Sequence, residues 1–179
     1  MEKAAIEYGD GLYALAKEEG LTDQIRKEAK ALRKIFLENP EYISLLTSKK
    51  LEDGERSKLM EESFSGRLHP YLYNFLLLLA DRGYFPYVTS CLYRYEACYL
   101  KDNNILKVKV SSAGVLPEEA KSRIVFGLEQ KLGGKVEPEW FVDPSLLAGI
   151  RVEADGLLIE NSAKQRIEDL KRLLGASVT

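Results

Sequence analysis

The chain has 179 residues, of which 45% are hydrophobic and 30% are charged, a balance typical of a soluble globular protein with one large or two small domains. Its formal net charge is −2, with 15 Lys and Arg against 17 Asp and Glu in residues 1–105 and 11 against 11 in residues 106–179, which argues against a nucleic-acid-binding surface. No apolar stretch is long enough for direct membrane insertion, and two cysteines without a visible signal peptide predict an intracellular protein with reduced thiols.

The first hundred residues carry the periodicity of amphipathic helices. Apolar residues three or four positions apart predict a first helix that ends at Gly20, and Thr22 can cap a second helix that ends before Asn39. Proline and aspartate residues mark the starts of four further helices, at Pro40, Asp53, Pro70 and Pro86. This pattern, which ends near Asp102, predicts a six-helix bundle over residues 1–105.

The pattern changes after this bundle. Leu106, Val108 and Val110 alternate with lysines and predict a half-buried strand, which a helix over residues 117–132 follows. A second strand contains Pro138, which favours an edge position, and the apolar runs on either side of Asp155-Gly156 predict a β-hairpin. With a last helix capped near residues 161–162, the expected fold is α+β, a helical bundle followed by a small C-terminal α/β domain over residues 106–179.

The predicted fifth helix is apolar around nearly its whole circumference in residues 71–80. Such a helix is either central in the bundle or leaves part of its surface for a partner, and the sequence supports both interpretations equally. A groove beside it would suit an amphipathic partner helix. We hypothesise that the first helix forms the other wall, with Gly9 and Gly11 allowing close approach.

No residue pattern predicts an active site, a metal site or a cofactor site. His69 precedes Pro70 at a helix start, where capping is the simpler role, and Cys91 and Cys98 lie seven residues apart on one helical face, which indicates burial and not zinc binding. The glycines near Lys135 lack the spacing of a phosphate-binding loop. Turn and capping roles also explain the remaining acidic candidates, which are Asp143, Asp155 and Glu160.

Several motifs together resemble one known family. They are Tyr8 with Leu12-Tyr13, Asn39-Pro40-Glu41, Asn74-Phe75-Leu76, and Val142-Asp143-Pro144-Ser145-Leu146 followed by Gly149-Ile150 and Asp155-Gly156. In order and spacing, these motifs resemble the delta subunit of bacterial and chloroplast F-type ATP synthases, whose mitochondrial relative is the oligomycin-sensitivity-conferring protein. The chain departs from the family at Gly9 and Gly11, where alanines are more usual.

The resemblance implies a non-catalytic stator subunit that stops the catalytic head from turning with the rotor during ATP synthesis. It implies a peripheral position on the cytoplasmic face of the bacterial inner membrane. The N-terminal domain would bind the N-terminal helix of an alpha subunit, and the C-terminal part would bind the C-termini of the peripheral-stalk b subunits.

From the resemblance and the apolar fifth helix, we expect nine residues to contact the alpha-subunit helix: Tyr8, Gly11, Leu12, Leu15, Asn74, Leu77, Leu78, Asp81 and Arg82. The alternative is a small-ligand-binding or regulatory two-domain protein unrelated to the rotary enzyme. That alternative requires a pocket with convergent polar groups, which the sequence does not display.

Overall fold

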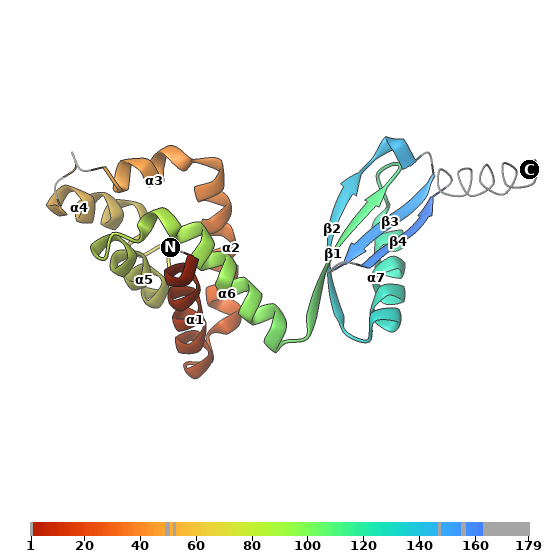
Figure 1. Ribbon diagram of the computed structural model, residues 1–179, viewed down its shortest axis with the longest axis horizontal. Helices are drawn as coiled ribbons and strands as arrows, with labels where there is room; N and C mark the ends of the chain where they lie inside the picture. The colour runs from red at the N-terminus through yellow and green to blue at the C-terminus, as the bar shows by residue number, and fades with distance from the viewer. Residues whose placement is uncertain (1, 49–50, 52, 147, 155–156, 163–179) are drawn as a thin grey trace, which may run out of the picture. The chain divides into compact units, whose positions relative to one another are not determined.

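The computed structural model describes residues 2–48, 51, 53–146, 148–154 and 157–162 (Figure 1). The chain divides into two compact units, Met1–Tyr99 and Leu100–Thr179. Over the described residues, helices make up the first unit, while the second combines a four-stranded mixed sheet with one long helix. The chain is therefore of the α+β class.

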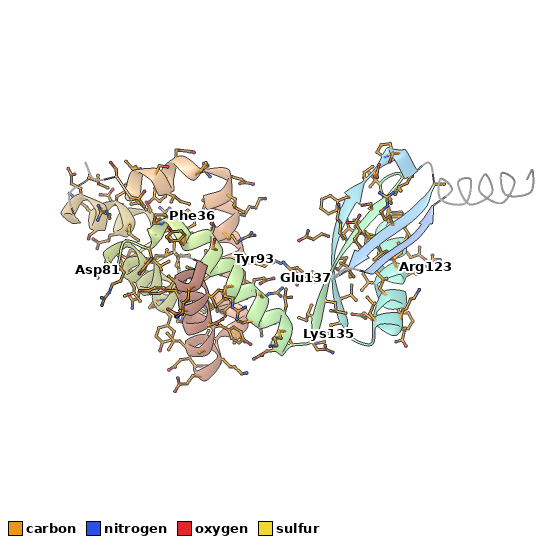
Figure 2. All side chains as sticks on the ribbon, viewed as in Figure 1. Phe36, Asp81, Tyr93, Arg123, Lys135 and Glu137 are labelled. Carbon is orange, nitrogen blue, oxygen red and sulfur yellow. The ribbon has the colours of Figure 1, made fainter. Side chains whose placement is uncertain are left out.

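The first unit contains the six predicted helices. They are α1 (Glu2–Glu18), α2 (Thr22–Glu38), α3 (Pro40–Leu46), α4 (Asp53–Phe64), α5 (Pro70–Asp81) and α6 (Val88–Asp102), with a short 3-10 helix, η1 (Phe85–Tyr87), before α6. Phe36 lies among the helices, whereas Asp81 lies at the surface (Figure 2). The Phe36 ring packs against the rings of Tyr42, Phe64 and Phe85 at centroid distances of 5.7 to 6.3 Å, so one aromatic cluster joins α2, α3, α4 and η1.

The helix boundaries follow the predicted signals with two exceptions. His69 caps α5, because its Nδ1 accepts a hydrogen bond of 3.3 Å from the backbone N–H of Tyr71. The predicted cap at Thr22 is wrong. The backbone N–H of Leu21 donates to the Ala16 carbonyl across the left-handed Gly20, and this closure of α1 makes Leu21 the N-cap of α2. The sixth helix begins at Val88 and not at Pro86, which lies in η1.

Helix α1 lies unusually close to α6. A Cβ atom on Gly9 would lie 2.6 Å from Arg94 Cβ and 2.7 Å from the Cys91 carbonyl oxygen, so only glycine fits there. One residue further along α1, the Asp10 carboxylate accepts hydrogen bonds from Arg94 Nε at 2.6 Å and from the Cys98 thiol at 3.0 Å. Gly9 therefore permits close packing inside the bundle, and the hypothesis that it makes room for a partner is wrong.

A buried ion pair joins α2 to α6. Glu96 is almost completely buried and accepts two hydrogen bonds from Arg26, at 2.9 Å and 2.7 Å. The Arg26 guanidinium lies 4.3 Å from the centre of the Tyr99 ring, and the Tyr99 hydroxyl donates to Asp23. This hydrogen bond raises the pKa of Tyr99. The network fixes the rotation of α6 about its axis, because both glutamate oxygens need a partner in the interior.

The two cysteines are free thiols with different surroundings. Cys91 is completely buried, and burial raises the pKa of its thiol to about 11. The structural role predicted for this residue is confirmed. Cys98 is half-buried and donates its hydrogen bond to Asp10.

The second unit is built on strand β1 (Ile105–Ser112). It continues with α7 (Glu118–Leu132), β2 (Lys135–Val142), the 3-10 helix η2 (Pro144–Leu146), β3 (Gly149–Ala154) and β4 (Leu157–Ser162). The strand order is β2-β1-β3-β4, with β1 parallel to β2 and antiparallel to β3, and with β3 antiparallel to β4. The small core of this unit contains Val108, Val110, Leu128, Val136, Val152 and Ala154.

Several predictions for this unit are confirmed. Strand β2, which contains Pro138, lies at an edge of the sheet, where a missing backbone N–H breaks no ladder. The predicted hairpin is the β3–β4 pair. Its turn residues Asp155-Gly156 and the predicted last helix lie outside the described residues.

We expect Gly9→Ala to destabilise the protein by about 1–3 kcal/mol, because the new methyl group would collide with the Cβ atom of Arg94 and with the backbone of α6. The matched variant Gly11→Ala has open space around it and should be neutral or stabilising by up to about 1 kcal/mol through helix propensity. Urea unfolding of both variants measures the difference. Equal stabilities would contradict the close α1–α6 packing.

We expect Asp10→Asn to lower the free energy of unfolding at pH 7 by about 0.5–1 kcal/mol, since the pair is partly exposed. Hydrogen bonds from Arg94 and Cys98 hold the pKa of the Asp10 carboxyl below its ordinary value. This stabilisation is present above the unfolded pKa and disappears as pH falls through the folded pKa. Urea titrations of both proteins between pH 7 and pH 2 should therefore show a difference in stability that shrinks below about pH 4. A difference independent of pH would refute this role.

Candidate functional site

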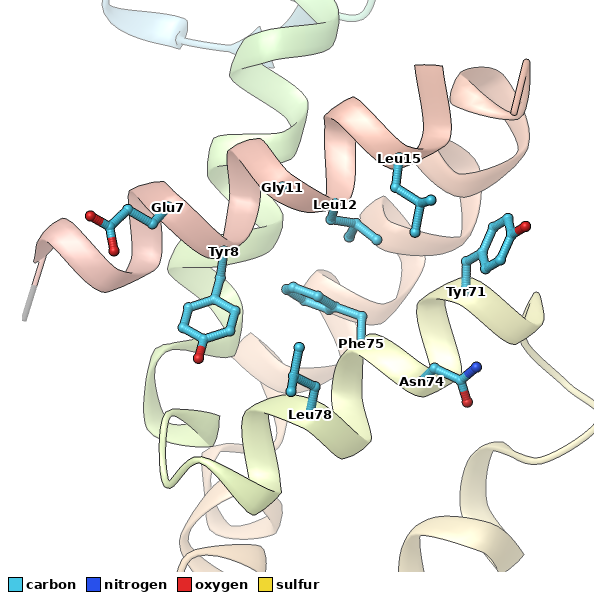
Figure 3. Close-up of a pocket in the computed structure, with 9 residues that line it drawn as sticks. All are labelled: Glu7, Tyr8, Gly11, Leu12, Leu15, Tyr71, Asn74, Phe75 and Leu78. Carbon is cyan, nitrogen blue, oxygen red and sulfur yellow. The ribbon is translucent and has the colours of Figure 1, made fainter. Parts of the chain in front are cut away.

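A groove of about 530 Å³ lies between α1 and α5 in the first unit (Figure 3). Its lining is mostly apolar, and it comes from two segments that are more than fifty residues apart in the sequence. The lining residues are Glu7, Tyr8, Gly11, Leu12 and Leu15 from α1, and Tyr71, Asn74, Phe75 and Leu78 from α5.

The α1 wall consists of the side of this helix that does not pack on α6. Leu12 is buried at the base of the groove, whereas Leu15 remains 37% exposed. A Cβ atom on Gly11 would meet nothing within 4 Å, so this position is the open part of the wall. The α1 wall is therefore an apolar surface with a gap where a partner side chain can enter.

The α5 wall shows how an almost wholly apolar helix is accommodated. One side of α5 is central, because Leu72, Leu76 and Leu79 are completely buried. Phe75 is nearly buried at the floor of the groove, but Leu78 is 42% exposed and Asn74 is exposed. The central position therefore holds for one side of α5, while the other side carries apolar surface that is exposed in the groove.

Aromatic residues close the two ends of the groove. At one end, the Tyr8 ring lies 5.3 Å from the Tyr84 ring, which follows the C-terminus of α5. At the other end, Tyr71 lies across from Leu15, and its ring is 5.2 Å from the His69 ring (Figure 3). Glu7 belongs to the Tyr8 end, so the groove has a charged end and an uncharged end.

Six of the nine residues expected to contact a partner line this groove: Tyr8, Gly11, Leu12, Leu15, Asn74 and Leu78. Leu77, Asp81 and Arg82 are not among the lining residues. Leu77 is half-buried. Consecutive residues of a helix are turned by about 100° around its axis, so Leu77 lies on a different side of α5 from Leu78.

Glu7, Tyr71 and Phe75 also line the groove, although they are not among the nine residues predicted from the sequence. Helical spacing of three or four residues connects Tyr71 and Phe75 to Asn74 and Leu78, and Glu7 to Gly11. This spacing is the feature of the sequence from which these three residues could have been predicted.

Two other hollows lie on the same unit, with volumes of about 470 and 500 Å³. The first is lined in part by Glu41 and Arg67, and the second by Arg33 and Arg94. Volume alone does not single out the α1–α5 groove. It is distinguished by a lining with a single charged residue, Glu7, which is the lining expected for an apolar helix face.

The described residues contain no cluster of His, Cys, Asp or Glu that could hold a metal ion. Among the helices of the described segments, none is both long enough and apolar enough to cross a membrane.

The sequence of the chain matches the model of the ATP synthase delta (OSCP) subunit family over residues 4–174. The chain belongs to this family. It is 32% identical over 165 residues to the ATP synthase subunit delta of Mycoplasma mobile, a match that covers 92% of each chain. It is also 32% identical over 164 residues to that of Prochlorococcus marinus subsp. pastoris, which covers 91% of each.

The fold has a counterpart among solved structures. A chain in the cryo-EM structure of the Toxoplasma gondii mitochondrial ATP synthase hexamer superposes with a TM-score of 0.69 at 13% identity, over 95% of this chain and 96% of that one. Family membership makes this chain a non-catalytic structural subunit of an ATP synthase complex, within its stator.

The groove wall and the core should respond differently to truncation. We expect Leu76→Ala to cost about 2–5 kcal/mol of stability, because it leaves a cavity in a completely buried site. Leu78→Ala should cost about 1 kcal/mol or less, because that side chain is largely exposed in the groove. Urea unfolding measures both. Similar costs would mean that Leu78 supports the fold and is not free for a partner.

Proposed function

We propose that this chain connects the catalytic head of an ATP synthase to its peripheral stalk. The groove between α1 and α5 binds the N-terminal helix of an alpha subunit, and the C-terminal unit binds the C-termini of the stalk b subunits. The chain then acts as a stator that resists rotor torque while proton flow drives ATP synthesis. The observation that carries the proposal is the exposed apolar groove in a chain of this family.

The dimensions of the groove support a helix as the occupant. From Glu7 to Leu15, the α1 wall rises by eight helical steps, which is about 12 Å at 1.5 Å per residue. A helix lying along this wall presents a little more than two turns, and its apolar side chains at positions i, i+4 and i+7 would meet Leu12, Leu15 and Leu78. Leu15 and Leu78 are partly exposed, and their removal from water supplies the affinity.

Exposed apolar side chains in the second unit support the stalk contact. Val115 is 86% exposed three residues after β1, and Val142 is 53% exposed at the end of β2. Ser112, the last residue of β1, pairs with Val142, so both apolar residues belong to the same end of the sheet. A stator held at two separate surfaces resists torque better than one held at a single surface.

The same proposal places the chain at the cytoplasmic face of a bacterial membrane, as a peripheral part of the complex. The curated relatives include bacterial delta subunits. Contact with the membrane would then be indirect, through the other subunits.

We expect a synthetic peptide of the alpha-subunit N-terminus to bind the purified chain, and Gly11→Trp to weaken this binding by at least about tenfold. The indole would occupy the open part of the groove, because nothing lies within 4 Å of a Cβ at Gly11. Isothermal titration calorimetry measures the affinity. The matched control is Gly127→Trp, at an equally open glycine of α7, which should bind the peptide normally.

Equal affinities of the two tryptophan variants would exclude the α1–α5 groove as the binding site. Saturable binding of a small molecule, with no binding of the peptide, would support the alternative of a ligand-binding or regulatory protein.

A further inference from the structure

The groove carries two polar side chains whose positions suit the selection of a partner. Resting on the proposed binding of the alpha-subunit helix, we propose that Glu7 and Asn74 determine which helix the groove accepts and in which direction it lies. The occupant places a lysine or arginine against Glu7 and a hydrogen-bonding side chain against Asn74. The apolar residues between them contribute to the affinity but do not distinguish between the two directions in which the occupant helix could lie.

Glu7 is the single charged residue among the residues that line the groove. Its side chain is 65% exposed, and its ion pair with Lys3 is loose, at 3.8 Å between two exposed side chains one helical turn apart. Such a pair contributes little stability and exchanges easily for another cation. The carboxylate lies at the rim of the Tyr8 end and points away from the α5 wall (Figure 3), so it is available to a basic side chain near one end of the occupant helix.

Asn74 carries the one carboxamide in residues 71–80 of α5, which are otherwise aliphatic or aromatic. Asparagine favours helices less than leucine or alanine does, so helix stability does not explain it. The side chain is exposed at the groove, and the described part of the chain offers its amide no hydrogen-bond partner. An occupant that donates to or accepts from this amide satisfies it at no cost to the fold.

The two polar residues lie on opposite walls and toward opposite ends of the groove. Glu7 is on α1 at the Tyr8 end, and Asn74 is on α5 toward the end where Tyr71 and Leu15 lie (Figure 3). A helix turned end for end would bring its basic residue to Asn74 and leave Glu7 without a cation. Two off-axis polar contacts therefore permit one direction, in the way that a polar position fixes register in a coiled coil.

A charge-swap experiment tests this assignment. In the alpha-subunit N-terminal peptide, each lysine or arginine is replaced in turn by glutamate, and binding is measured to the wild-type chain, to Glu7→Lys and to Glu7→Gln. At low salt, we expect Glu7→Gln to lower the affinity for the unmodified peptide about 3-fold and Glu7→Lys to lower it about 10-fold. Most of this loss should come from slower association. Both effects should shrink at high salt.

One glutamate-substituted peptide should bind Glu7→Lys more tightly than it binds the wild-type chain. The matched control is Glu18→Lys, on an exposed residue of α1 that does not line the groove. This variant should restore the binding of none of the glutamate-substituted peptides. A benzophenone at the rescued position should cross-link to the first ten residues of the chain. In the reversed direction it would cross-link near Tyr71.

The outcomes separate this inference from the proposed function. A peptide that fails to bind the wild-type chain overturns the proposed function. Three results overturn the charge selection and leave the groove in place. The peptide binds but contains no basic residue, or Glu7→Lys restores the binding of no substituted peptide, or Glu7→Lys and Glu18→Lys change the affinity for the peptide equally. Cross-linking near Tyr71 overturns the direction.

Discussion

The close approach of α1 to α6 is the constraint on which the binding groove depends. Gly9 lets the two helix backbones meet, and the hydrogen bonds from Arg94 to Asp10 hold α1 at that rotation about its axis. With one side of α1 fixed against α6, the side that carries Gly11 and Leu15 is turned toward α5. A larger residue at position 9 would push α1 outward and change the groove without altering any residue that lines it.

The groove also shows how one helix can contribute to the core on one side and leave apolar surface exposed on the other. The buried side of α5 contributes three completely buried leucines, so this helix cannot move when the groove is filled. Leu78 and Leu15 stay partly in water in the free chain, and an apolar surface of this kind marks an interaction site. A rigid wall that is already formed lowers the entropic cost of binding a helix, which suits a subunit that must hold under load.

The two units carry separate surfaces. The helical unit contains a concave groove, whereas the second unit carries the exposed Val115 and Val142 at the end of a parallel strand pair. Strand β1 is central to this arrangement, because it pairs with both β2 and β3 and follows α6 directly in the chain. Separate surfaces on separately folded units let a stator subunit bind two partners without competition between them.

The sequence by itself determined the helices, the strands and the family, because periodicity, proline positions and turn residues act over a few neighbouring residues. His69 as a cap, Pro138 at an edge and the β3–β4 pairing are of this kind. Periodicity also placed Tyr8 and Leu12 on one side of α1, and both line the groove.

The tertiary structure decided which element each side of a helix packs against. Only the packing of helices far apart in sequence assigned Gly9 to the core and Gly11 to the groove, removed Leu77 from the lining and added Glu7. Asp10 and Arg94 are 84 residues apart, and no local pattern connects them. Side chains three or four residues apart share a helix face by geometry, but the neighbour of that face depends on how the whole bundle closes.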